Sequence, residues 1–106
     1  MIDPGSLNRR LVLEAPVETA DGLGGVTRSY TAVATLWAAV EPVAVRHDVV
    51  ADAAGATVTH RIVIRYSPDI TTRHRFRDGA VVYRIVTLRE TVRRRFLEIH
   101  AEERDD

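Results

Sequence analysis

The sequence has no cysteine and no lysine, and aromatic residues make up only 6% of it. Because cysteine is absent, disulfides, thiol catalysis and the usual structural zinc sites are excluded, and stability must come from packing. The longest nearly apolar run, Ala32 to Val40, is far shorter than the roughly 20 residues of a membrane-spanning helix. The N-terminal residues also lack the basic start and apolar stretch of a signal peptide. We therefore expect no membrane partner, and a protein that stays in the cytosol unless it is packaged.

What the sequence does have is a segregated set of charges on a chain of one-domain size, which we place over residues 1–106. Arginines and acids balance overall, 15 against 15. The net charge is nevertheless −3 over residues 1–60 (four arginines, seven acids), +7 over residues 61–95 (ten, three) and −4 over residues 96–106 (one, five). This segregation suits electrostatic matching between neighbouring surfaces, and arginine favours interface pairs and phosphate contacts. The alternative is that the charges lie on solvated strand faces.

Most of the chain carries strand signals, above all alternation of apolar and polar residues. The expected strands are Arg9–Pro16, Val26–Thr31, Leu36–Val40, Thr57–Tyr66, residues 75–77, residues 81–88 and a last strand around Phe96, Leu97 and Ile99. We expect Pro16 to end the first strand, and residues 36–40 to be either a third strand or a bent continuation of the second. An acidic tail that includes Glu102 and Glu103 follows the last strand, and we expect it to fray. The expected buried core is Trp37, Ile62, Ile64, Tyr83, Ile85, Leu97 and Ile99.

Two glycine-containing stretches predict tight turns. Asp78-Gly79 has the composition of a two-residue hairpin turn. The stretch Asp21–Gly25 is richer in glycine, but its spacing fits neither the GxGxxG fingerprint nor the P-loop, and a strand-forming segment follows it. We therefore expect a turn at Asp21–Gly25 with no nucleotide to hold.

The segment Val43–Ala54 differs from the rest because it is rich in alanine, with Val45 and Val49 spaced four apart. Pro42 precedes it and Gly55 follows, which is the punctuation expected of a helix. We expect a short helix or a partly helical loop here.

The residues that usually carry chemistry do not form a recognisable site. No two of the four histidines have a metal-ligand spacing, and the serines lack a nucleophile-elbow motif. We therefore expect no enzymatic activity, no catalytic residues, no metal and no cofactor. The run Arg93–Arg95 has the composition of a nucleic-acid patch, but few aromatic residues lie near it to stack on bases.

Five stretches, in order, carry a resemblance to a known family: GSLNRRL (residues 5–11), ETADGLGGV (18–26), LWAAVEP (36–42), HRIVIRY (60–66) and DGAVVYRI (78–85). With these stretches the chain resembles the phage head–tail joining proteins, also called head-closure or stopper proteins, of long-tailed phages, prophages and gene transfer agents. The resemblance implies an all-β fold, a small antiparallel β-barrel or sandwich with one short helix or long loop at about residues 43–55. It also implies a virion component, assembled in the bacterial cytoplasm, at the head–tail interface.

The same resemblance implies a ring that closes the DNA-filled head and provides the attachment surface for the tail. The implied partners are copies of the chain itself, the portal or adaptor on the head side, the tail terminator or tail tube on the tail side, and double-stranded DNA passing non-specifically through the channel. A loop facing the channel would contain Val45, Asp48, Val49 and Asp52. Subunit or partner contacts are expected at Asp21, Leu23, Arg93, Arg94, Arg95, Glu102 and Glu103.

One alternative function uses the arginine excess directly. A small β-barrel that binds single-stranded nucleic acid would place the arginines of residues 61–95 along the phosphate backbone. Binding to oligonucleotides that weakens steeply with salt would distinguish this module from a structural connector.

Overall fold

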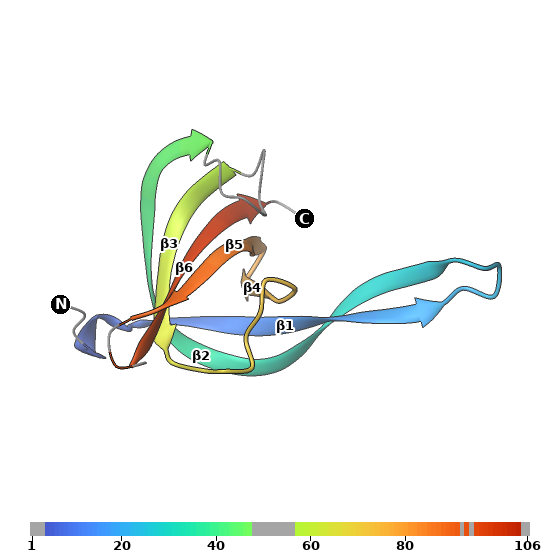
Figure 1. Cartoon of the computed structure of the whole chain (residues 1–106), viewed down its shortest axis with the longest axis horizontal. Coiled ribbons are helices and arrows are strands. Elements are labelled where there is room, and N and C mark those ends of the chain that lie inside the picture. The colour runs from blue at the N-terminus through green and yellow to red at the C-terminus, as the bar shows by residue number, and fades with distance from the viewer. Residues whose placement is uncertain (1–3, 48–56, 92, 94, 105–106) are drawn as a thin grey trace.

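The computed structural model describes residues 4–47, 57–91, 93 and 95–104, and these are mainly β-strand (Figure 1). A short 3-10 helix, η1 (Pro4–Ser6), is followed by β1 (Arg9–Ala20), β2 (Val26–His47), β3 (Thr57–Arg65), β4 (Arg75–Asp78), β5 (Val81–Glu90) and β6 (Phe96–Arg104). The strands pair antiparallel in the order β1-β2-β3-β6-β5-β4, and β4 pairs with β1 again, so the sheet closes into a barrel. The expected all-β, antiparallel fold is confirmed.

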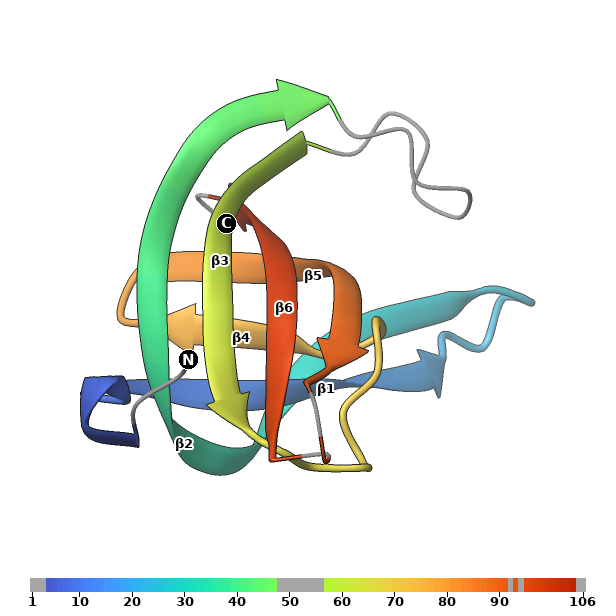
Figure 2. The same cartoon turned by 60° about the vertical axis from the view of Figure 1, so that its left-hand side comes forward.

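The longest strand, β2, pairs with two neighbouring strands along its length. Its first part pairs with β1, from Val26 opposite Ala20 to Ala38 opposite Arg9. Its second part pairs with β3, beginning with Ala38 opposite Ile64. Figure 2 shows how β2 curves around the barrel to do this. Residues 26–31 and 36–40 therefore belong to one bent strand, the second of the two arrangements that the sequence left open.

The barrel interior is filled by alternate residues of the strands, because successive side chains of a strand point to opposite faces. Six of the seven residues expected in the core are buried: Ile62, Ile64, Tyr83, Ile85, Leu97 and Ile99. Leu11, Leu13 and Phe76 complete the same cluster from β1 and β4. The hairpin at Asp78-Gly79 is also confirmed, since β4 and β5 pair on either side of it and Gly79 has a φ of 60°.

The seventh expected core residue, Trp37, is not buried: 56% of it is exposed. Ala38, its neighbour on β2, is fully buried. Adjacent residues of a strand face opposite ways, so the small residue points into the barrel and the large one points out. The expectation for Trp37 was wrong because strand register, and not side-chain size, decides which residues enter the core.

A helix over residues 43–54 is wrong for its first part. Val43–His47 is the end of β2, where Arg46 lies opposite Val58 and His47 opposite Thr57, after an irregularity that begins at Pro42. Pairing with β3 supplies backbone hydrogen bonds that a short isolated helix cannot match. Residues 48–54 lie outside the described part of the chain.

Two expected strand ends were also wrong. Pro16 does not end β1, because it lies opposite Tyr30 and the strand continues to Ala20. Among the described strands, β1 pairs here with β2 alone, and an edge strand accommodates proline. Glu102 and Glu103 do not lie in a frayed tail but in β6, opposite Arg84 and Tyr83 of β5.

The hairpin of β1 and β2 extends well beyond the barrel. Pairing between β1 and β4 covers only Val12 to Glu14, and after this point β1 pairs with β2 alone. We call the projecting hairpin, residues 15–31, the arm. Figure 1 shows it reaching away from the barrel, in a molecule that measures 51 × 30 × 27 Å.

Candidate interaction surfaces: the arm and the basic end

The turn at the tip of the arm is held by its own hydrogen bonds. Asp21 Oδ1 accepts the backbone N–H of Leu23 at 2.7 Å and of Gly25 at 3.0 Å, and the Asp21 N–H donates to the Gly25 carbonyl at 3.1 Å. Gly22 and Gly24 have φ angles of 80° and 87°, which glycine adopts without strain. A Cβ on Gly25 would lie 2.7 Å from Asp21 Oδ2. The expected turn is confirmed. Backbone conformation favours glycine at positions 22 and 24, and the close approach of Asp21 favours glycine at position 25.

This turn presents one large apolar side chain. Leu23 is 91% exposed, the highest value among the exposed large apolar residues of the described chain. Glycines flank it on both sides, so no neighbouring side chain covers it. An ordered turn that displays a leucine has the geometry of an anchor for a partner.

The two faces of the arm differ in charge. Residues opposite each other in the hairpin share a face, and one face consists of Ala15, Val17, Thr19, Thr27, Ser29 and Thr31, none of them charged. On the other face, Glu18 and Arg28 form an ion pair at 3.0 Å, and Tyr30 lies beneath the Arg75 guanidinium at 3.7 Å. The uncharged face is the one that continues the inward face of β1 beyond the barrel.

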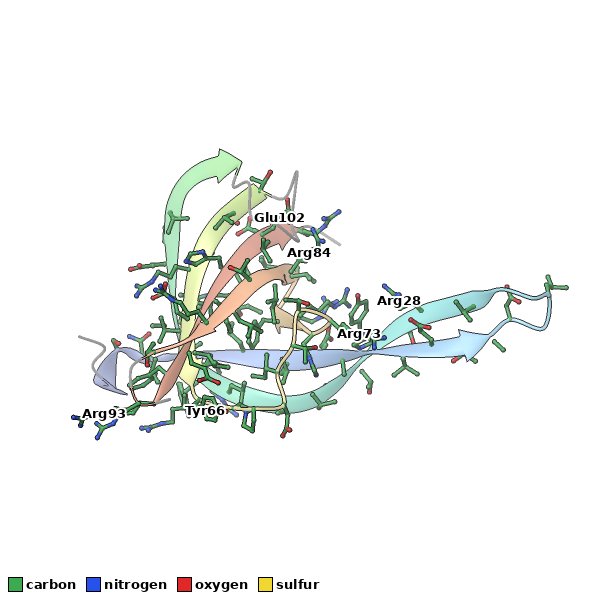
Figure 3. All side chains as sticks on the ribbon, in the orientation of Figure 1. Arg28, Tyr66, Arg73, Arg84, Arg93 and Glu102 are labelled. Carbon is green, nitrogen blue, oxygen red and sulfur yellow. The ribbon has the colours of Figure 1, made fainter. Side chains whose placement is uncertain are left out.

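The carboxylate of Glu14 joins the base of the arm to β4. Glu14, only 9% exposed, accepts hydrogen bonds from Arg75 Nε at 2.6 Å and Arg77 Nε at 3.1 Å. Burial of the Glu14 carboxyl raises its pKa, but the hydrogen bonds and positive charges of Arg75 and Arg77 together outweigh burial, and the net pKa is lowered. Farther along, Arg73 lies 3.7 Å from Glu18. Figure 3 shows Arg73 and Arg28 near the point where the arm leaves the barrel.

Folding mixes the charges that are segregated along the sequence. Glu98 of β6 pairs with Arg61 at 2.9 Å and Arg89 at 3.0 Å, and the hydrogen bond from Arg61 lowers the pKa of the Glu98 carboxyl against the effect of burial. Glu102 lies 3.7 Å from Arg84 of β5, a pair that is visible in Figure 3. Most arginines of residues 61–95 are therefore engaged by carboxylates of the same chain.

The arginines left over gather at one end of the barrel, which we call the basic end. Among the described residues, no carboxylate pairs with Arg10, Arg65, Arg93 or Arg95. The Tyr66 N–H donates to the Arg95 carbonyl at 3.0 Å, which joins the end of β3 to the turn before β6. Figure 3 shows Arg93 and Tyr66 at this end, away from the arm.

The basic end also holds an apolar hollow. A space of about 380 Å³ is lined by Leu7, Asn8, Trp37 and Arg65. Arg10 lies over the Trp37 ring, 5.6 Å from its centroid, and Leu7 packs on Val63 and Phe96 beneath. The hollow thus combines an apolar floor with a rim of cations that lack a described acidic partner.

The structure separates the residues expected at interfaces into three places. Asp21 and Leu23 lie at the tip of the arm, Arg93 and Arg95 at the basic end, and Glu102 and Glu103 at the far end of β6, where they pair within the chain. Arg94 lies outside the described residues.

The expected channel loop is largely untested. Val45 lies in β2, with its side chain not described, while Asp48, Val49 and Asp52 lie outside the described residues. The loop therefore stays a prediction.

Sequence reasoning missed Arg10, Arg65 and the exposed face of Trp37. Arg10 and Trp37 lie opposite each other across β1 and β2, 27 positions apart in the sequence. Counting the hairpin register back from the Asp21–Gly25 turn would place Arg10 opposite Leu36, because an irregularity between Leu13 and Glu14 shifts the pairing by one residue. The sequence signals considered above therefore do not link Arg10 to Trp37.

Within the described residues, no group of three or more histidine and acidic side chains is placed to hold a metal ion. The described chain likewise offers no helix long and apolar enough to cross a membrane.

Comparisons with known proteins agree with one another. A chain from the virion of a native gene transfer agent particle is similar at 33% identity and a TM-score of 0.68, over 93% of this chain and 96% of that one. The solution structure of protein SF1141 from Shigella flexneri 2a is similar at 27% identity and a TM-score of 0.71, over 96% of each chain. No curated protein matches. The family model for phage head completion proteins matches residues 2–104, and the chain therefore belongs to that family, as the sequence resemblance predicted.

Proposed function

We propose that this chain is a structural component of a phage or phage-like particle, where it forms a ring at the head–tail connector that closes the DNA-filled head and receives the tail. The observation that carries the proposal is the match to phage head completion proteins over residues 2–104. The similarity to a chain of a gene transfer agent virion over 93% of the length supports placement in a particle.

The proposed partners follow from this position. They are copies of the chain itself, a portal or adaptor protein on the head side, a tail terminator or tail tube protein on the tail side, and DNA that passes through without sequence-specific contacts. The arm and the basic end support a role in assembly, because a single copy leaves the uncharged face of the arm and the arginines of the basic end without partners among the described residues. Surfaces of this kind mark sites of association.

Electrostatic contacts should contribute to the ring. We expect the exposed arginines to face acidic groups of another copy or of a partner ring, so raising the salt concentration should weaken assembly. Sedimentation of assembled rings at increasing salt measures this dependence. Assembly that strengthens with salt would show that the contacts are chiefly apolar.

The alternative, a barrel that binds single-stranded nucleic acid, draws less support from the structure. Six of the ten arginines in residues 61–95 pair with carboxylates of the chain: Arg61, Arg73, Arg75, Arg77, Arg84 and Arg89. An arginine held in such a pair is less available to a phosphate backbone, which leaves only the basic end for this role.

Removal of the chain from particles tests the proposed function. Electron microscopy of particles made without it should show heads without tails, and packaged DNA should become sensitive to nuclease. Restoring the wild-type chain should restore tailed, nuclease-resistant particles. Tailed particles that retain DNA in its absence would rule out the proposal.

A further inference from the structure

The tip of the arm and the hollow of the basic end have complementary chemistry. The tip offers Leu23 on a turn fixed by the Asp21 carboxylate. The hollow offers an apolar floor at Leu7 and Trp37, and its volume of about 380 Å³ is larger than a leucine side chain. A leucine moved from water into such a space loses unfavourable contact with solvent, and Trp37 provides a wide apolar surface against which it packs.

Charge favours the same pairing. The arm carries Glu18 and Asp21 against Arg28, a net charge of −1. The basic end carries Arg10, Arg65, Arg93 and Arg95 with no acidic partner among the described residues. A tip of negative charge that enters a rim of arginines gains Coulomb attraction, which also selects this end of the barrel over the acid-containing end of β6.

The two surfaces cannot meet within one copy. The helix η1, which directly precedes Leu7, lies at one end of the long axis, and the β1–β2 turn lies at the other end in both views (Figures 1 and 2). A surface at one end that matches a surface at the other end produces a head-to-tail contact between copies. Such heterologous contacts generate rings when the rotation between copies closes.

We propose that Leu23 at the tip of the arm of one copy binds in the hollow formed by Leu7, Trp37 and Arg65 on a second copy of the chain. This inference rests on the proposed ring, and it assigns the arm as the element that links neighbouring copies. The tip enters with its turn already formed, so little conformational entropy is lost on binding.

Disulfide cross-linking tests the contact directly, because the chain contains no cysteine of its own. Leu23→Cys combined with Asn8→Cys, which is exposed at the edge of the hollow, should give a ladder of covalently linked copies when particles are oxidised. A matched control combines Leu23→Cys with Thr72→Cys, an exposed position in the loop before β4, and should give no ladder. Equal ladders from both pairs, or none from the first, would overturn the inference.

Substitutions give a second, quantitative test. Leu23→Ala and Trp37→Ala should each weaken association of copies by about tenfold or more, since each removes most of a buried apolar contact. The double variant should be little worse than either single one, because the two side chains contribute to one contact. Val33→Thr, on β2 outside the arm and 53% exposed, serves as the control and should leave association unchanged.

The outcomes separate this inference from the proposed function. If rings of Leu23→Ala form normally while tails fail to attach, the tip binds another virion protein, and the inference is wrong although the connector role stands. If the Trp37→Ala variant assembles normally but loses binding to oligonucleotides, the hollow serves nucleic acid, and the inference is again wrong. If particles lacking the chain keep both DNA and tails, the connector role itself is wrong.

Discussion

Strands β1 and β2 run through both the barrel and the arm, yet the inward face of β1 carries different residues in the two regions. Within the barrel, that face of β1 carries Leu11 and Leu13, which are 0% and 6% exposed. Along the arm, the same alternation continues with Ala15, Val17 and Thr19, which are small or β-branched and increasingly exposed. Strand formation therefore continues where burial stops.

The difference shows that the arm is a strand pair without a core of its own. Its stability comes from hairpin pairing, the Asp21 turn and the anchoring of Glu14 on β4, because an isolated two-stranded hairpin is marginal in water. Its uncharged face carries small and hydroxyl side chains and lacks the charged residues that protect many exposed strands from pairing. The barrel thus contains the buried core that stabilises the fold, whereas the arm presents a surface suited to association.

The largest expected effect lies in the barrel. Ile62→Ala or Ile64→Ala should lower the free energy of unfolding by about 2–5 kcal/mol, because each removes a fully enclosed side chain and leaves a cavity. Chemical denaturation of the purified variants measures the loss. A loss below about 1 kcal/mol for both would move β3 out of the core and break the contrast with the arm.

The next effect lies where the two regions join. Glu14→Gln should lower the free energy of unfolding by about 2 kcal/mol, because it leaves Arg75 and Arg77 without their anionic partner at a nearly buried site. Glu18→Gln is the matched control on the arm, where the exposed pairs with Arg28 and Arg73 should contribute less than about 1 kcal/mol.

Acid titration checks the same junction without a substitution. The folded pKa of Glu14 is lowered from its ordinary value of 4.5, so its contribution to stability is present above that value and is lost as the pH falls through the folded pKa. Glu98 acts in the same direction through Arg61. Glu14→Gln should therefore flatten part of the acid limb of the stability curve, and an unchanged limb would show that Glu14 contributes nothing through its charge.

The contrast between barrel and arm also explains what the sequence could predict. Ile62 and Ile64 were found by alternation, and the Asp21–Gly25 turn by glycine, because both signals are local. The pairing of Glu14 with Arg75, 61 residues apart, depends on which strands become neighbours when the barrel closes. The end of β2 at Val43–His47 was missed for the same reason, since its helix-like composition is overruled by pairing with β3.

Trp37 is the sharpest case of this limit. Replacing a buried tryptophan by alanine lowers the free energy of unfolding by about 3–5 kcal/mol. Because Trp37 is 56% exposed, we expect Trp37→Ala to lower the free energy of unfolding of the isolated subunit by less than about 1.5 kcal/mol. The remaining loss reflects contact with Arg10 and the floor of the hollow. Denaturation of the isolated subunit gives the value, and a cost near that of Ile62→Ala would return Trp37 to the core and close the hollow.

The smallest expected effect on stability is for a substitution on the arm. It is best measured beside a substitution in the barrel, on the same face of the same strand. Val17→Thr keeps a β-branched side chain at a position that is 40% exposed, so the free energy of unfolding should change by less than about 0.5 kcal/mol. Leu13→Thr, four residues earlier, removes core volume and buries a hydroxyl, and should cost more than about 2 kcal/mol. Both values come from denaturation of isolated subunits, where no neighbouring copy covers the arm. A cost at Val17 as large as that at Leu13 would mean that the arm folds back onto the barrel in solution, and that the free subunit does not present this face to a partner.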